Sequence, residues 1–228
     1  MESNLIVGLV VVIGIVLFIT FGIFSYIADK KRREALRDLA SKLGLSFNES
    51  QNYDIAIQYS FLNKLTQGDN RYVFNTFSGV YRGEQVVISD YHYETHSTDS
   101  KGRQRTNHHY LSLFALQMPT AFPELTIVTE GILSKIAQSF GYDDIDFESH
   151  EFSRTFCVRS RDKKSAYAIC NARMIEYLLG NKDLSIEIER NTLALIFDSQ
   201  LAIEQVETNL NRMLEIRSRM PDYLFTRI

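Results

Sequence analysis

The chain has 228 residues, a formal net charge of −3, 45% hydrophobic residues and only three prolines, a composition that excludes a disordered chain. All 25 lysines and arginines follow Asp29, and Glu2 and Asp29 are the only acidic residues before them, so the remainder is nearly neutral and gives no electrostatic reason to expect nucleic acid. Two cysteines, Cys157 and Cys170, are too few for a disulfide framework and are expected to be buried free thiols.

The first predicted element is a transmembrane helix over Leu5–Ile27, a stretch without any charged residue. About twenty apolar residues at roughly 1.5 Å each cross the hydrocarbon layer of a bilayer. A cleaved signal peptide is the alternative, but no basic residue precedes the apolar run and no small-residue cleavage site follows it. We therefore expect an anchor at residues 1–29 and a soluble part at residues 30–228.

The flanks of this helix predict its direction. Only Glu2 precedes it, whereas Lys30, Lys31, Arg32 and Arg33 follow it directly. Because basic residues collect on the cytoplasmic side of membrane helices, we expect the N-terminus outside and the C-terminal domain in the cytoplasm. The same four cations are also candidates for contact with anionic lipid headgroups or a partner.

The next predicted helix follows the anchor without a proline or glycine between them. Residues 34–43 place Leu36, Leu39, Ala40 and Leu43 on one face, and Gly44 is a natural helix end. The membrane helix is therefore expected to continue directly into the domain as a stiff junction.

The remaining pattern predicts an α+β fold of antiparallel hairpins packed with short helices. Strands rich in valine, isoleucine and aromatic residues are expected over 71–83, 84–96, 110–118 and 125–131, before a helix over 132–140. Farther on we expect strands at 156–160 and 165–170, a helix at 171–180, and a hairpin of 184–189 with 192–197. A final helix is expected to be capped by Asp198 or Ser199. Two subdomains, 30–130 and 131–228, are an alternative to a single domain.

One cluster of histidines and carboxylates is a candidate metal site. If residues 86–96 form a strand, alternation places His92, Glu94 and His96 on one face with Asp90. A hairpin partner that begins near His108 would place that residue opposite His96 and Tyr110 opposite Glu94. Imidazoles and carboxylates of this kind bind zinc and other divalent transition metals. The alternative is a polar hairpin face exposed to solvent, above a buried face of tyrosines and leucines.

The predicted loop at residues 97–107 carries Lys101, Arg103 and Arg105. A long polar loop of this kind is a candidate surface for lipid headgroups, an anionic ligand or a protein partner, although it is also typical of a solvated hairpin tip.

Catalytic signatures are missing from the sequence. It contains no GxSxG, HExxH, phosphate-binding loop, GxGxxG or CxxC pattern. No catalytic residue or resident cofactor is predicted, apart from the divalent metal, and an enzyme is left open but unsupported.

The order of these segments resembles a family. An N-terminal membrane helix, REALRDLASKLGL, VVISDYHYET, DIDFESHEFSRTFCV and AYAICNARMIEYLL together resemble an uncharacterised family of bacterial single-pass membrane-anchored proteins. The resemblance implies a bacterial source, the inner membrane and a cytoplasmic domain, but no activity.

These observations lead to a membrane-tethered, non-enzymatic interaction or scaffolding module with an unknown protein partner. A metal-dependent enzyme or metal sensor is one alternative, and binding of anionic lipid or ligand is another.

Overall fold

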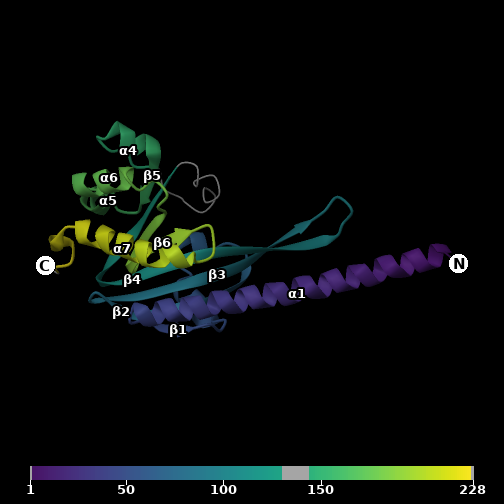
Figure 1. Ribbon diagram of the computed structural model, residues 1–228. Coiled ribbons are helices and arrows are strands. Elements are labelled where there is room, and N and C mark those ends of the chain that lie inside the picture. Colours follow the sequence, from purple (N-terminus) through teal and green to yellow (C-terminus); the bar gives the residue numbers. More distant parts are fainter. Residues whose placement is uncertain (1, 130–143, 227–228) are drawn as a thin grey trace.

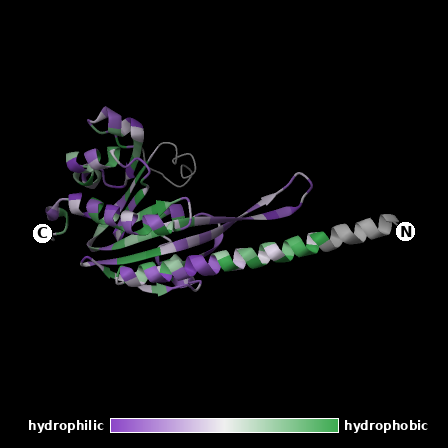
Figure 2. Ribbon diagram, in the orientation of Figure 1, coloured by the Kyte–Doolittle hydropathy of each residue, from purple (hydrophilic) through white to green (hydrophobic). Residues whose placement is uncertain are grey.

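The first helix joins a membrane-length apolar segment to the folded domain. The computed structural model describes residues 2–129 and 144–226, with side chains from residue 13 onward. Helix α1 runs unbroken over Glu2–Lys42 (Figure 1). In the described part of the chain it is the one helix long and apolar enough to cross a membrane, and its apolar half stands clear of the domain (Figure 2). Its last turns bury Leu36 and Ala40, and the chain turns away at Gly44, which has a φ of 71°. The predicted continuous helix is confirmed.

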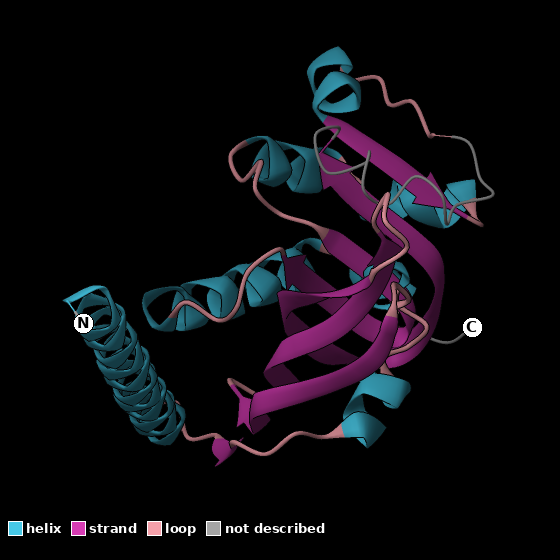
Figure 3. Cartoon of the chain, turned by 90° about the vertical axis from the view of Figure 1, so that its right-hand side faces the viewer, coloured by secondary structure: helices cyan, strands magenta, loops and turns pink. Residues whose placement is uncertain are grey.

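The domain is built on one antiparallel sheet in the order β1-β2-β3-β4-β5. Strands β3 and β5 pair with successive parts of β4, and β6 pairs with both parts along the opposite edge of β4. Figure 3 shows this sheet strongly twisted, with α1 to one side of it. The strands are β1 (Ser46–Asn48), β2 (Asp69–Tyr81), β3 (Glu84–Thr98), β4 (Gln104–Thr129), β5 (Phe156–Ser160) and β6 (Ile186–Phe197). Strand β4 lies within the first of the two possible subdomain ranges and β6 within the second, so the sheet spans both.

Helices cover both faces of the sheet. On one face, the larger core is lined by the end of α1 and by four further helices: α4 (His150–Thr155), α5 (Lys163–Ile169), α6 (Ala172–Leu179) and α7 (Ile203–Arg219). On the other face, α2 (Tyr53–Gln58) and the 3-10 turn η1 (Asn63–Leu65) cover a smaller core that includes Tyr91 and Leu113. A second 3-10 turn, η2 (Asp222–Leu224), follows α7. The α+β prediction is confirmed.

Several predicted elements differ from the structure. One strand, β4, contains the expected strand 110–118 and residues 125–129 of the expected strand 125–131, whose last two residues lie outside the described residues. The hairpin expected around Arg190 is one strand, β6. Both halves of β6 pair with β4, and Arg190, with a φ of 52°, lies where the register shifts. The strand expected at 165–170 is mostly helix α5, which the Asp162 side chain caps by accepting from the Lys164 N–H.

The last helix also begins later than expected. It starts at Ile203 after Ala202, and neither Asp198 nor Ser199 caps it. Its apolar stripe is nevertheless buried, with Val206, Leu210 and Met213 in the larger core. The helix expected at 132–140 lies outside the described residues.

The hairpin of β3 and β4 projects far beyond the body of the domain. Its tip lies at Asp99–Arg103, where the Asp99 N–H donates to the Arg103 carbonyl (3.0 Å). Figure 1 shows the hairpin extending in the same direction as the N-terminal half of α1, and Figure 2 shows that the hairpin is polar whereas that half of the helix is apolar.

Candidate functional site

The polar row predicted on β3 exists. Asp90, His92, Glu94 and His96 alternate along the strand face that also presents Val86 and Ile88 to the larger core. The row divides into two sites. Asp90 contacts α1, whereas the other three residues lie nearer the hairpin tip, where His92 and Glu94 form a cluster with His108 and His96 lies beside Asp69.

Asp90 connects the membrane-proximal helix to the sheet. Its fully buried carboxylate accepts from Arg32 Nη1 (2.9 Å) and Nη2 (3.2 Å), and from the Leu201 N–H (2.7 Å). Arg32 Nη2 also donates to the Leu201 carbonyl (2.9 Å). One carboxylate and one guanidinium therefore join α1, β3 and the segment before α7, and we call this contact the junction lock.

The cluster consists of His92, Glu94 and His108. His92 Nε2 lies 3.0 Å from His108 Nδ1, and Glu94 Oε1 lies 3.4 Å from that atom and 4.0 Å from His92 Nε2. The strand register differs from the prediction by two residues, since His108 faces Glu94, Tyr110 faces His92 and Thr106 faces His96. A shift of two residues preserves the faces, so three of the four predicted residues, His92, Glu94 and His108, still meet.

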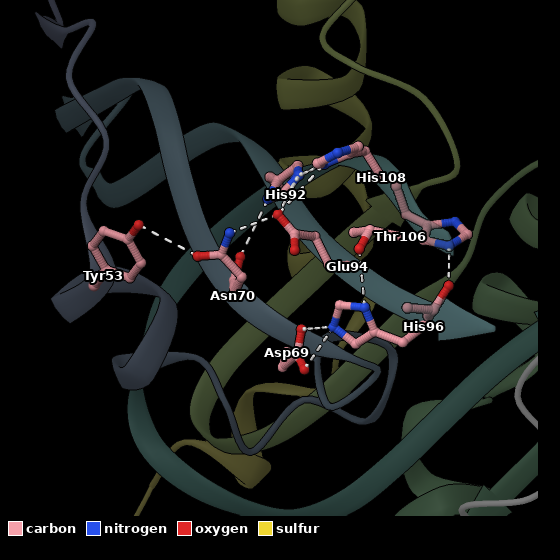
Figure 4. Close-up of polar contacts among 10 residues, drawn as sticks. Tyr53, Asp69, Asn70, His92, Glu94, His96, Thr106 and His108 are labelled. Atoms are coloured by element: carbon pink, nitrogen blue, oxygen red, sulfur yellow. Dashed lines mark hydrogen bonds and ion pairs between the residues drawn. The ribbon is translucent and has the colours of Figure 1, made fainter. Parts of the chain in front are cut away.

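His96 belongs to a neighbouring pair rather than to the same trio. Its Nε2 lies 3.1 Å from each carboxylate oxygen of Asp69 on β2 (Figure 4). Sequence reasoning missed Asp69, because only the pairing of Asp69 with Glu94 across β2 and β3 brings it here. Both members of this pair are exposed, whereas the His92 side chain is 2% exposed and that of Glu94 is 16% exposed.

Two β-bulges in β2 aim asparagines at the β3 carboxylates. The register shifts after Asp69 and after Phe74, and Asn70 and Asn75 take positive φ angles of 44° and 50° at these places. Asn75 Nδ2 donates to Asp90 (2.8 Å), and Asn70 Nδ2 donates to Glu94 (2.6 Å). Left-handed backbone is uncommon for residues other than glycine, and asparagine tolerates it best.

The surroundings of His92 determine its protonation. Its Nδ1 lies 3.2 Å from the Asn70 carbonyl, which can only accept, so Nδ1 carries the proton and Nε2 has a free lone pair. Tyr72 stacks on the ring at 4.4 Å. Burial lowers the pKa of His92, against smaller raising effects of the Asn70 carbonyl and Glu94. The imidazole is therefore neutral at physiological pH.

The predicted basic residues are divided between the helix and the hairpin tip. Arg32 points inward to the junction lock, Lys30 lies 3.9 Å from Glu34, and Arg33 lies 3.9 Å from Glu49. Lys31 is exposed. At the tip Lys101, Arg103 and Arg105 are exposed, and Arg103 pairs with Asp99 at 2.9 Å.

The two cysteines are buried free thiols on β5 and after α5. Burial raises the pKa of Cys157 to about 11 and that of Cys170 to about 12. Since the thiolate is the nucleophile, both are unreactive at physiological pH.

Comparisons with known proteins identify the fold. No family model matches the chain and no curated protein matches its sequence, so the resemblance to a bacterial membrane-anchored family stays a prediction. The fold is similar to the crystal structure of the mycobacterial trehalose monomycolate transport factor A, TtfA, with a TM-score of 0.56 at 12% identity. The match covers 83% of this chain and 96% of that chain. At this identity the likeness shows the fold alone, and the chain therefore shares its α+β architecture with this transport factor.

Proposed function

We propose that this protein is a membrane-tethered, non-enzymatic interaction module that holds a partner protein at a set orientation to the bilayer. In this proposal α1 crosses a bacterial inner membrane and the α+β domain lies in the cytoplasm. The fold similarity to a transport factor supports an accessory role in a membrane process, and the basic residues after the apolar segment support the direction.

The observation that carries the proposal is the junction between helix and domain. A flexible tether would need an irregular, polar segment after the apolar stretch, but α1 continues for about four more turns and buries Leu36 and Ala40 in the domain core. The junction lock then fixes the rotation of the helix against the sheet. A rigid connection of this kind is useful when the orientation of the domain to the membrane matters.

The cysteine chemistry favours binding over catalysis. The thiols of Cys157 and Cys170 are buried and have raised pKa values, so neither is a reactive nucleophile. Turnover by the full chain, abolished by a point substitution that leaves the fold intact, would refute the non-enzymatic part of the proposal.

Insertions into α1 test the role of orientation. Two alanines between Ala28 and Asp29 would rotate the domain by about 200° and lift it by about 3 Å, whereas seven would restore the rotation to within about 20° but lift it by about 10 Å. The partner is captured by crosslinking in native membranes, purification through a C-terminal tag and mass spectrometry.

We expect the seven-residue insertion to retain more of the partner than the two-residue insertion. The opposite order would show that distance matters rather than orientation. Equal capture of the partner by both insertion variants and the wild type would show that α1 only tethers the domain to the membrane. This result, like the opposite order, would contradict the proposal. Protease added to intact spheroplasts checks the direction, since a cytoplasmic domain is protected.

The projecting hairpin supports a second candidate function, contact with anionic lipid. The roughly nine residues from Asp90 to Asp99 reach about 30 Å at 3.3 Å each, a length equal to about twenty residues of α1. Because the hairpin runs in the same direction as α1 (Figure 1), its tip lies level with the apolar segment. Charged side chains are costly in hydrocarbon, so this candidate requires a tilt that keeps Lys101, Arg103 and Arg105 at the headgroups.

Vesicle binding tests this candidate. We expect residues 30–228, without the apolar segment, to bind vesicles that contain anionic lipid, and this binding to fall steeply as salt rises. Replacing Lys101 and Arg105 by glutamine should weaken binding, whereas replacing Lys163 and Lys164, at the far end of the domain, should not. Equal loss in both variants would exclude the hairpin as the contact.

A further inference from the structure

We propose that His92 Nε2, His108 Nδ1 and a carboxylate oxygen of Glu94 bind one divalent transition metal ion and leave a coordination position open. The site goes beyond the interaction module, because metal binding needs neither the membrane nor a partner. It uses three of the four residues grouped by the strand pattern and excludes His96.

The spacing of the three donor atoms fits such an ion. Metal–ligand bonds of about 2.0–2.1 Å in tetrahedral geometry place the ligand atoms about 3.3 Å apart. In the structure the three separations are 3.0, 3.4 and 4.0 Å. Side-chain movements of well under 1 Å therefore suffice to equalise them.

The two histidines can supply lone pairs at little chemical cost. His92 donates its Nδ1 proton to the Asn70 carbonyl, so its Nε2 is already free to bind. Without an ion, this lone pair accepts the Nδ1 proton of His108. Binding of an ion to His108 Nδ1 uses the other tautomer of that ring, with its proton on Nε2 at the exposed side.

Outer contacts hold the ligands as they do in known metal sites. A ligating histidine commonly donates its other N–H to a carbonyl, and ligating carboxylates are themselves hydrogen-bonded. Here Asn70 serves both, through its carbonyl to His92 and its Nδ2 to Glu94 (Figure 4). The Tyr53 hydroxyl donates to the Asn70 side-chain oxygen at 3.4 Å, which orients that amide.

Charge and access favour a cation at this place. Among the described residues, the Glu94 carboxylate lies within ion-pair distance of two imidazoles rather than of a lysine or arginine. Asp69 adds a second carboxylate close by. The side chain of His108 is 55% exposed, so an ion can reach the site and a fourth ligand can approach. Two imidazoles with one carboxylate suit zinc or iron(II), whereas calcium and magnesium prefer oxygen ligands.

The test uses the full chain, purified in detergent without a histidine tag and stripped of metal. Zinc is titrated against a chromophoric chelator, and cobalt(II) is added to read the coordination geometry from its visible spectrum. The central variant is His108→Ala, because this exposed residue can be removed without a cavity in the core. His109→Ala is the matched control, since His109 lies on the opposite face of the same strand, stacked on Tyr93.

We expect one zinc ion per chain, tetrahedral cobalt bands, and no competition from calcium or magnesium. His108→Ala should weaken zinc binding by about 100-fold or more, because losing even an outer partner of a ligand costs 10–100-fold. His109→Ala and His96→Ala should bind as the wild type does. Absence of zinc binding, equal effects of His108→Ala and His109→Ala, or loss in His96→Ala alone would each overturn the assignment.

Discussion

Substituting Asp90 by asparagine tests the junction lock directly. The carboxylate is fully buried and accepts hydrogen bonds from Arg32, Asn75 and the Leu201 N–H. Asparagine keeps the shape but removes the charge and turns one acceptor into a donor. The Arg32 guanidinium is left without its counter-charge, and at least one donor loses its partner.

The expected cost follows from the burial of the pair. Breaking a buried ion pair by removing one member costs about 3–5 kcal/mol. The Arg32 side chain is 25% exposed, so water compensates part of the loss and the lower end, about 3 kcal/mol, is appropriate. For a domain of this size, about 1 kcal/mol shifts the Tm by about 2–4 °C, so Asp90→Asn should lower the Tm by about 6–12 °C.

Thermal unfolding of the full chain in detergent provides the assay. Near-UV circular dichroism of the buried tyrosines reports on the domain rather than on the apolar half of α1. The double variant with Arg32→Met should cost less than the sum of the two single substitutions, with a coupling of about 1–3 kcal/mol. A shift below about 2 °C for Asp90→Asn, or additive single costs, would refute the claim that this pair fixes α1 against the sheet.

Three other predictions concern the domain itself. Burial raises the pKa of Glu187 to about 7 from 4.5, so between pH 4.5 and 7 the native state binds more protons than the unfolded state does. The stability that this group contributes should therefore fall by about 3 kcal/mol as pH rises from 4.5 to 7. Urea unfolding of Glu187→Gln should lack this slope, and an unchanged slope would exclude Glu187 as its source. Gly68→Ala should destabilise the domain by more than about 2 kcal/mol, because the new Cβ would lie 2.0 Å from the Glu94 carbonyl oxygen at a φ of 59°. Gly83→Ala, where a Cβ meets nothing within 4 Å, should lower the Tm by less in the same melting assay. Cys157 and Cys170 should resist a thiol reagent until the domain unfolds, and rapid labelling of the native protein would contradict their burial.

The strand pattern predicted the face of the candidate site but not its register. His92, Glu94 and His108 meet as expected because side chains alternate with a period of two. The exact partners depend on where the hairpin turns, and the turn is shorter than the polar loop suggested, with β3 reaching Thr98 and β4 beginning at Gln104. The ends of both strands were therefore predicted as loop because their residues are polar.

Features that depend on distant pairing could not be predicted. Asp69 joins the site only through the bulged pairing of β2 with β3, and neither bulge has a strong sequence signal. Arg190 and Asn191 look like a turn, but β4 offers a continuous partner on both sides of them, so the strand bends instead of reversing. Likewise, residues of β-strand type in α5 form a helix because Asp162 caps it and Ala166 and Ile169 are buried.

With α1 across the bilayer, as proposed, the projecting hairpin limits the tilt of the molecule. A lone transmembrane helix tilts freely, commonly by about 20°. Here the charged hairpin reaches the level of the apolar half of α1, so a tilt that lowers it further is unfavourable and a tilt that raises it toward the headgroups is favoured. In the proposed arrangement the hairpin therefore sets the direction in which α1 tilts.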